Sequence, residues 1–215
     1  MGTKYQLAEV SANEARTADR ILFVHGWKRL SKKHRQTAFY RCLRDHGYQG
    51  QIWALRWPYK LLDPVHGFDD VAKDHAAEVW DWFGNIGWDA GRTSLLGYSA
   101  GSSLVRCLLW EAAAHGAAFR RAYFIGSVTS ACGNWARPLR AVQDKAYVFW
   151  SSNDGVGKFP FNIFCPRLPI GCYGLDRDDL KLRSIDCSSI INSHYNWETQ
   201  FDLCLRRAGL RPHRL

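Results

Sequence analysis

The stretch Arg92–His115, RTSLLGYSAGSSLVRCLLWEAAAH, decides the expected fold. Thr93–Leu96 is mostly apolar and suits a buried strand, whereas Ser102–Ala114 carries apolar residues at helical spacing. Between them, residues 97–101 read GYSAG, which is a G-x-S-x-G pentapeptide. A sharp turn from a strand into a helix is the setting in which this pentapeptide presents a nucleophilic serine. The plainer interpretation, a glycine–serine turn before an ordinary helix, stays open at this point.

The chemistry of an activated serine explains the residues of the pentapeptide. A serine hydroxyl is a weak nucleophile and needs an adjacent base, so Ser99 must stand clear of the backbone on a strained turn. Gly97 and Gly101 lack Cβ atoms, which allows strand and helix to pack closely around that turn. The N–H of Ala100 would be left free at the helix N-terminus, where it can bind an oxyanion.

The rest of the chain alternates strands with helices. Strands are expected at residues 21–24, 51–57, 93–96, 122–128, 146–151 and 180–186, and helices at 35–45, 70–83, 102–114 and 197–208. Residues 134–142 are expected to form a short helix or an irregular turn. This alternation predicts a mostly parallel sheet covered by helices on both faces. The 215 residues suit one domain, 1–215. We expect residues 1–19 to be a loose arm or a short edge element, and 155–179 to form a long irregular loop.

The composition limits the class of protein. Hydrophobic residues make up 47% of the chain, which excludes a disordered protein. No apolar run reaches the length of a membrane span, and the first twenty residues lack the apolar centre of a secretory signal. We therefore expect a cytoplasmic protein, although export without such a signal stays open.

Positive charge dominates the surface chemistry. The formal net charge is +9, which would attract an anionic partner such as a membrane surface, although a solvated basic face is equally consistent. No nucleic-acid-binding signature is present. The oligomeric state stays open.

The seven cysteines are scattered at 42, 107, 132, 165, 172, 187 and 204, with no C-x-x-C pair. Cys42, Cys107 and Cys204 fall in apolar helical patterns and are expected to be core thiols. Cys165 and Cys172 share one loop and could pair in an oxidising compartment. No group of residues has metal-ligand spacing, and no cofactor is needed for serine chemistry.

Polar residues follow several of the expected strands. In open parallel sheets, sites form beyond the carboxyl ends of the strands, and His25-Gly26-Trp27, Ser99, Asp154 and His194 all lie at such ends. The order serine, aspartate, histidine along the chain is typical of one hydrolase architecture. Asp154 could instead be only a turn residue. Its competitors in the following loop are Asp176, Asp178 and Asp179.

Through the GYSAG pentapeptide, the His25-Gly26 turn, Asp154 and His194, the chain resembles the serine α/β-hydrolase superfamily, in particular small esterases and lipases without a cap domain. The resemblance covers roughly residues 20–208. The resemblance implies that Ser99 is the nucleophile, that His194 takes its proton and that Asp154 orients the imidazole and stabilises its cation. It further implies an oxyanion hole made by the N–H groups of Trp27 and Ala100. His25 would then support the oxyanion turn. Basic residues at 28–34, where lipases often have apolar lid contacts, weaken the lipase assignment.

The expected function is cleavage of carboxylic esters through an acyl-enzyme on Ser99, acting on a small-molecule or lipid ester. Tyr98, Trp57 and Phe159 are candidates for an apolar acyl pocket, although aromatic residues are more often core. One alternative is an acyltransferase or thioesterase that acts on a carrier-bound acyl group. Another is a binding protein that kept the fold without the chemistry.

Overall fold

The computed structural model describes residues 5–10, 18–26, 32–58, 68–155, 168–177, 179–211 and 215. Seven strands form one sheet in these ranges: β1 (Gln6–Glu9), β2 (Arg20–Val24), β3 (Gln51–Arg56), β4 (Thr93–Tyr98), β5 (Ala122–Ile125), β6 (Ala146–Trp150) and β7 (Leu182–Asp186). Their order is β1-β3-β2-β4-β5-β6-β7. Only β1 is antiparallel, at the edge beside β3, and every other pairing is parallel.

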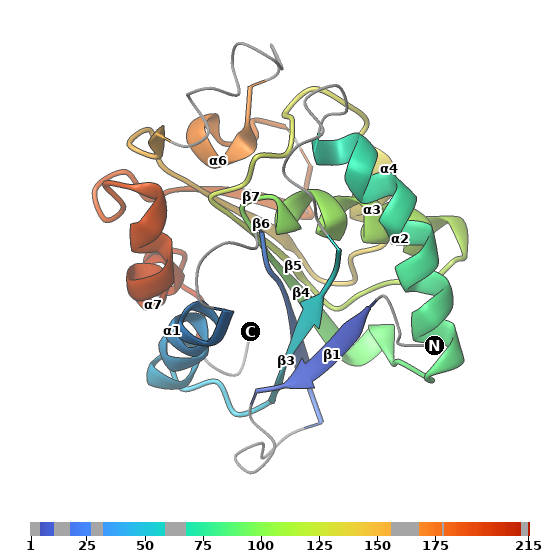
Figure 1. The fold of residues 1–215 in the computed structure, drawn as a ribbon. Helices are drawn as coiled ribbons and strands as arrows, with labels where there is room; N and C mark the ends of the chain where they lie inside the picture. Colours follow the sequence, from blue (N-terminus) through green and yellow to red (C-terminus); the bar gives the residue numbers. More distant parts are fainter. Residues whose placement is uncertain are drawn as a thin grey trace.

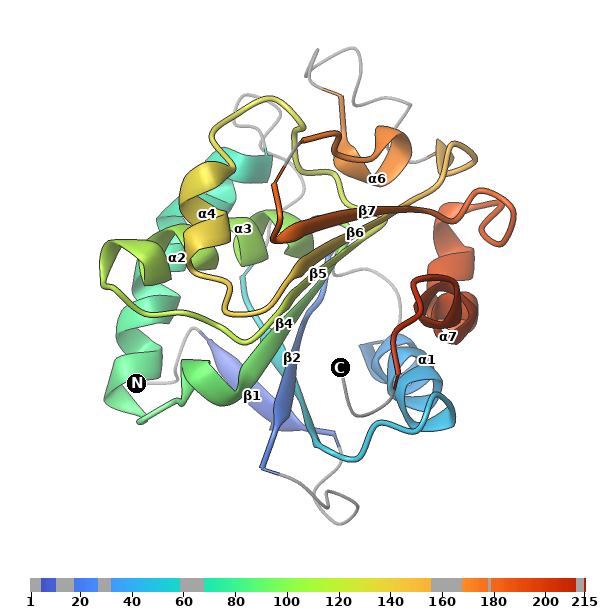
Figure 2. The same cartoon turned by 180° about the vertical axis from the view of Figure 1, so that it is seen from behind.

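Helices cover both faces of this sheet (Figure 1). They are α1 (Lys32–Asp45), α2 (Phe68–Asn85), α3 (Gly101–Ala114), α4 (Ala136–Arg140), α6 (Ile170–Tyr173) and α7 (Trp197–Arg207). Figures 1 and 2 show α1 and α7 side by side on one face, with α2, α3 and α4 on the other. The expected layered α/β architecture is therefore present, and the described ranges contain no separate cap domain.

The alternation of side chains along the strands builds two cores. Along β2, Leu22 and Val24 face α2 and α3, whereas Ile21 and Phe23 face α1 and α7, as the two-residue period of a strand requires. Both sets are almost fully buried. A strand buried on both faces reads as a continuous apolar run, which is why these segments were recognisable in the sequence.

The sheet topology places the candidate site where two neighbouring strands lead to opposite faces of the sheet. β2 has β3 on one side and β4 on the other, so the chain leaves β2 and β4 toward opposite faces, into α1 and α3 respectively. Ligands in open α/β sheets bind at such a switch point. The register pairs Val24 with Gly97, which brings the turn after β2 beside the turn after β4.

Two strands have bounds that differ from the prediction. β5 ends at Ile125 instead of continuing to residue 128, because Gly126 has φ +48° and turns the chain out of the sheet. β7 begins at Leu182 and not at residue 180, because a turn joins the Leu182 N–H to the Asp179 carbonyl. Leu180 is consequently 92% exposed and is not part of the apolar face predicted for this strand.

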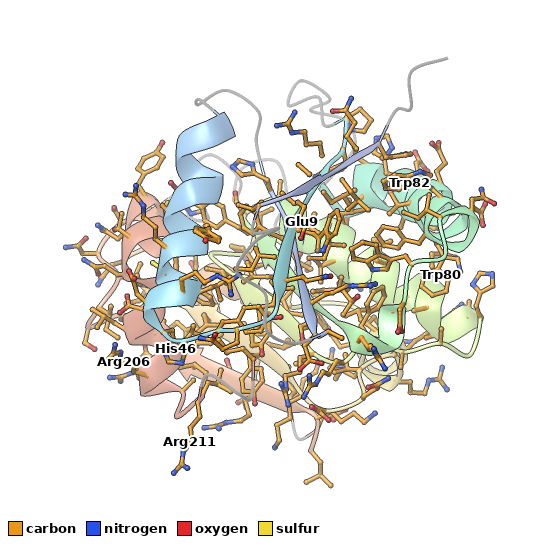
Figure 3. The ribbon with its side chains drawn as sticks, turned by 90° about the horizontal axis from the view of Figure 1, so that it is seen from below. Glu9, His46, Trp80, Trp82, Arg206 and Arg211 are labelled. Atoms are coloured by element: carbon orange, nitrogen blue, oxygen red, sulfur yellow. The ribbon has the colours of Figure 1, made fainter. Side chains whose placement is uncertain are left out.

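Figure 3 shows Trp80 and Trp82 on the α2 side, and Arg206 and Arg211 on the α7 side. None of the helices described combines the length and the apolar character that a membrane span requires.

Candidate active site

Ser99 occupies a strained turn between β4 and α3. It has φ +54°, the only positive value at a non-glycine residue in the described ranges, and the left-handed region costs such a residue about 1–2 kcal/mol. Two backbone hydrogen bonds hold the turn: the Ser99 N–H donates to the Ile125 carbonyl, and the Ser102 N–H donates to the Ser99 carbonyl, both at 3.0 Å. Ser99 is partly exposed, whereas all six residues of β4 are buried.

Close packing around this turn leaves no room for a side chain at three glycines, which are Gly26, Gly97 and Gly101. A Cβ at Gly101 would lie 2.1 Å from the Val24 carbonyl oxygen, so α3 can approach β2 only with glycine there. A Cβ at Gly26 would lie 2.9 Å from the Cβ of Ser99 and 3.1 Å from the N of Ala100. The turn after β2 is therefore pressed against the serine and against the start of α3.

The turn after β2 is held by two ring nitrogens. The indole N–H of Trp57 donates to the His25 carbonyl at 2.9 Å, and His25 Nδ1 lies 3.0 Å from the Gly26 carbonyl oxygen. Ala100 is the N-cap of α3, one of the positions at which backbone N–H groups have no intrahelical partner. Trp27, the other predicted oxyanion donor, lies outside the described residues.

Asp154 and His194 meet at the ends of β6 and β7. His194 Nδ1 lies 2.9 Å from Oδ2 and 3.0 Å from Oδ1 of Asp154, and the two side chains are 7% and 1% exposed. An ionised carboxylate can only accept hydrogen bonds, so Nδ1 carries the hydrogen in this arrangement. Nε2 of the neutral ring is then a proton acceptor.

Two aromatic residues, Trp197 and Tyr98, contact Asp154 and His194, and the sequence did not predict these contacts. The indole N–H of Trp197 donates to Oδ2 of Asp154 at 2.8 Å. The ring of Tyr98 stacks on His194 with centroids 5.1 Å apart, and its hydroxyl donates to the His194 carbonyl at 3.0 Å. Because Tyr98 directly precedes Ser99, this contact holds the histidine loop beside the serine turn. The sequence feature that could have indicated the contact of Trp197 with Asp154 is its position three residues after His194, which is about one helical turn.

The loop residues that competed with Asp154 have other surroundings. Asp179 caps the turn before β7, where its carboxylate accepts from the Lys181 N–H at 2.8 Å, and Asp178 is outside the described residues. The side chain of Cys172 is buried, and its S–H donates to the Asp154 carbonyl at 3.1 Å. Cys165, with which Cys172 could pair in an oxidising compartment, lies outside the described residues, so that pairing stays a prediction.

Two of the three residues predicted for an acyl pocket are buried in the structure. Tyr98 is 1% exposed and Trp57 is 8% exposed. Tyr98 packs among Phe39 and His194, and Trp57 packs in the core on the α2 side. Both therefore belong to the core in this structure, and their part in an acyl pocket stays a prediction. Phe159 lies outside the described residues.

The remaining predictions concern cysteines and metals. Cys42, Cys107 and Cys204 are buried thiols, as predicted, and burial raises the pKa of the Cys107 thiol to about 12. In the part of the chain that the structure describes, no three His, Cys, Asp or Glu side chains come together in a way that could hold a metal ion.

No protein-family model matches the sequence, and no curated protein matches it at a significant level. Solved structures do match. An esterase from Pyrobaculum calidifontis has a TM-score of 0.52 at 13% identity, over 95% of this chain and 86% of that chain. A CIB-like hydrolase from Thermoplasma acidophilum has a TM-score of 0.53 at 14% identity, over 95% and 89% of the two chains.

A third similar structure is one of two fungal esterases from Rhizomucor miehei, with a TM-score of 0.56 at 13% identity over 95% of this chain and 78% of that chain. These three structures come from different organisms and share little sequence with the protein, so the similarity concerns the path of the chain. The order of the strands, the position of the serine turn and these matches agree: the chain has the α/β-hydrolase fold.

Proposed function

We propose that the protein is a serine hydrolase that cleaves carboxylic esters through an acyl-enzyme on Ser99. The observation that carries the proposal is the strained backbone of Ser99 at the β4–α3 turn, φ +54°. Strain of this kind persists only where the surrounding structure enforces it, and it gathers at functional sites. A turn that needed no exposed serine could place glycine there without strain.

The proposed reaction uses four groups. The Ser99 hydroxyl attacks the ester carbonyl carbon, and its proton passes to Nε2 of His194. The tetrahedral oxyanion accepts hydrogen bonds from the N–H of Ala100 and, in this proposal, of Trp27. The carbon–oxygen bond then breaks, and the alkoxide leaves with the proton from His194. Water repeats the sequence on the acyl-enzyme and releases the acid.

Asp154 has a supporting part in this scheme. Its contact with Nδ1 of His194 fixes the tautomer that leaves Nε2 free to accept a proton. When His194 becomes an imidazolium, the buried carboxylate stabilises the new charge. The structurally similar proteins support an ester as the substrate, because they include the esterases named above and an arylesterase with a TM-score of 0.52 at 12% identity.

The test is hydrolysis of p-nitrophenyl esters of increasing acyl length by the wild type and by Ser99→Ala. We expect turnover in the wild type and a loss of roughly a thousandfold or more in Ser99→Ala. Ser103→Ala is the matched control, because its hydroxyl is buried four residues further along and contacts Thr129 at 3.1 Å. Equal rates in wild type and Ser99→Ala would exclude Ser99 from the mechanism.

A fluorophosphonate probe separates the proposal from its alternatives. Labelling of Ser99 together with ester turnover supports the esterase. Labelling without turnover of any ester indicates that the acyl donor is of another class, such as a carrier-bound thioester. Absence of both labelling and turnover would favour a binding protein with the hydrolase fold.

A further inference from the structure

The carboxylate of Asp154 is approached by two ring N–H groups from one stretch of chain. His194 and Trp197 are three residues apart, and Trp197 begins α7 directly after the short helical turn His194–Asn196. One helical turn therefore aims two rings at one carboxylate. His194 Nδ1 spans both oxygens at 2.9 and 3.0 Å, whereas the Trp197 N–H donates to Oδ2 alone at 2.8 Å.

The position of the indole is fixed by its packing. The side chain of Trp197 is fully buried in the core between the sheet and α7. Its edge lies against Gly126, where an added Cβ would be 2.8 Å from both Cδ1 and Nε1 of the indole and 3.1 Å from Oδ2 of Asp154. The backbone at Gly126 also has φ +48°, which favours glycine. The indole consequently has little freedom to move away from the carboxylate.

A buried carboxylate requires hydrogen-bond donors, because burial without them is expensive. The Trp197 N–H supplies one such donor without adding a positive charge. It also binds one identified oxygen, which restricts rotation of the carboxylate plane. That plane decides whether both oxygens face Nδ1 of His194, and the direction of Nδ1–H decides where Nε2 points.

We infer that Trp197 is a positioning residue that fixes the Asp154 carboxylate through its indole N–H and thereby holds His194 in its working orientation. The inference rests on the proposed function for its catalytic consequence, while the contact itself can be measured without any substrate. Trp197 touches neither the ester nor the reacting atoms in this scheme. Its contribution reaches the reaction through Asp154 and His194.

The experiment compares Trp197→Phe with Trp135→Phe. Trp135 is the matched control, since it is fully buried and its indole N–H donates to the Ser130 carbonyl at 3.3 Å, but it packs in the core on the α2 side. We expect Trp197→Phe to lower kcat for p-nitrophenyl esters about tenfold with little change in KM. Trp135→Phe should leave both constants unchanged. A kcat for Trp197→Phe equal to that of the wild type would overturn the inference.

A double-mutant cycle tests whether Trp197 acts through Asp154. In the Asp154→Asn background, Trp197→Phe should have less than a threefold further effect on kcat, because the carboxylate that it positions is already gone. Fully additive losses would contradict action through Asp154.

Incorporation of 3-benzothienylalanine at position 197 replaces the N–H of the ring by sulfur and keeps the bicyclic ring. The test of the N–H group therefore does not depend on a variant with altered packing.

An NMR measurement separates failure of this inference from failure of the proposed function. The Nδ1–H proton of His194 reports its hydrogen bond to Asp154 whether or not the protein hydrolyses esters. We expect its resonance to shift and its exchange with water to accelerate in Trp197→Phe and not in Trp135→Phe. An unchanged resonance in Trp197→Phe disproves the positioning role, whereas a changed resonance without ester turnover leaves that role standing and removes the esterase.

Discussion

At the carboxyl ends of the strands, the side chain of Asp154 is 1% exposed, and ring N–H groups of His194 and Trp197 contact its carboxylate. At the opposite ends, Asp144 precedes β6 with its side chain 46% exposed, and the guanidinium groups of Arg120 and Arg121 contact it. An aspartate thus occurs in two environments, buried at position 154 and solvent-exposed at position 144. Water already solvates the second carboxylate, so its ion pairs contribute little; the first depends on the protein for its hydrogen bonds.

Among the substitutions that test this comparison, the one at Asp154 should have the largest effect on kcat. Asp154→Asn keeps the shape of the side chain but presents a neutral amide to His194, which favours the wrong tautomer. We expect kcat for ester hydrolysis to fall by roughly 10³- to 10⁴-fold. The measurement is steady-state kinetics at neutral pH, with the near-ultraviolet circular dichroism spectrum as a check on the fold. A loss of less than tenfold would show that Asp154 is not the acid of the site.

An intermediate effect is expected from crowding the contact between Asp154 and Trp197. Gly126→Ala places a methyl group 2.8 Å from the indole at a backbone φ of +48°, so we expect unfolding in urea to become about 2 kcal/mol easier and kcat to fall. Gly116→Ala is the control, since Gly116 has φ +67° with nothing within 4 Å of its added Cβ. Equal losses in the two variants would mean that backbone strain, and not the contact, sets the effect.

The smallest effect on stability and on kcat is expected at Asp144, at the amino ends of the strands. Asp144→Asn removes the charge that Arg120 and Arg121 contact, and Arg121 keeps its hydrogen bond to the Leu215 carbonyl at 2.8 Å. We expect the free energy of unfolding to change by about 1 kcal/mol or less and kcat to stay at the wild-type value. Urea titrations in low and high salt measure this. A loss of activity here would show that the two ends of the sheet are coupled.

The sequence predicted the architecture well because each central strand is buried on both faces. Such strands appear as apolar runs, and the segments at residues 21–24, 93–96 and 146–151 were located to within one or two residues. Errors occurred where a turn, and not hydrophobicity, ends a strand. The left-handed backbone of Gly126 and the exposure of Leu180 depend on neighbouring segments, and no local pattern records them.

The sequence predicted which residues belong to the candidate site, which stays a proposal, but it did not indicate the side chains that hold them in place. Ser99, Asp154 and His194 stood out because polar residues follow apolar strands there. The indole of Trp197 looked like an ordinary apolar position at the start of a helix, since the sequence does not show which atom of a tryptophan meets a partner. Tyr98 was a candidate for an acyl pocket, and the structure places it in the core, where its hydroxyl donates to the His194 carbonyl.

The contact between Tyr98 and His194 has a consequence for folding kinetics. It joins residues 96 positions apart in the chain, and the Asp154–His194 contact joins residues 40 apart. Contacts of such separation form only after the intervening strands have been placed, and they slow folding. Recovery of the proposed esterase activity after dilution from denaturant should therefore follow the completion of the whole sheet, so that this activity would report a late step of folding.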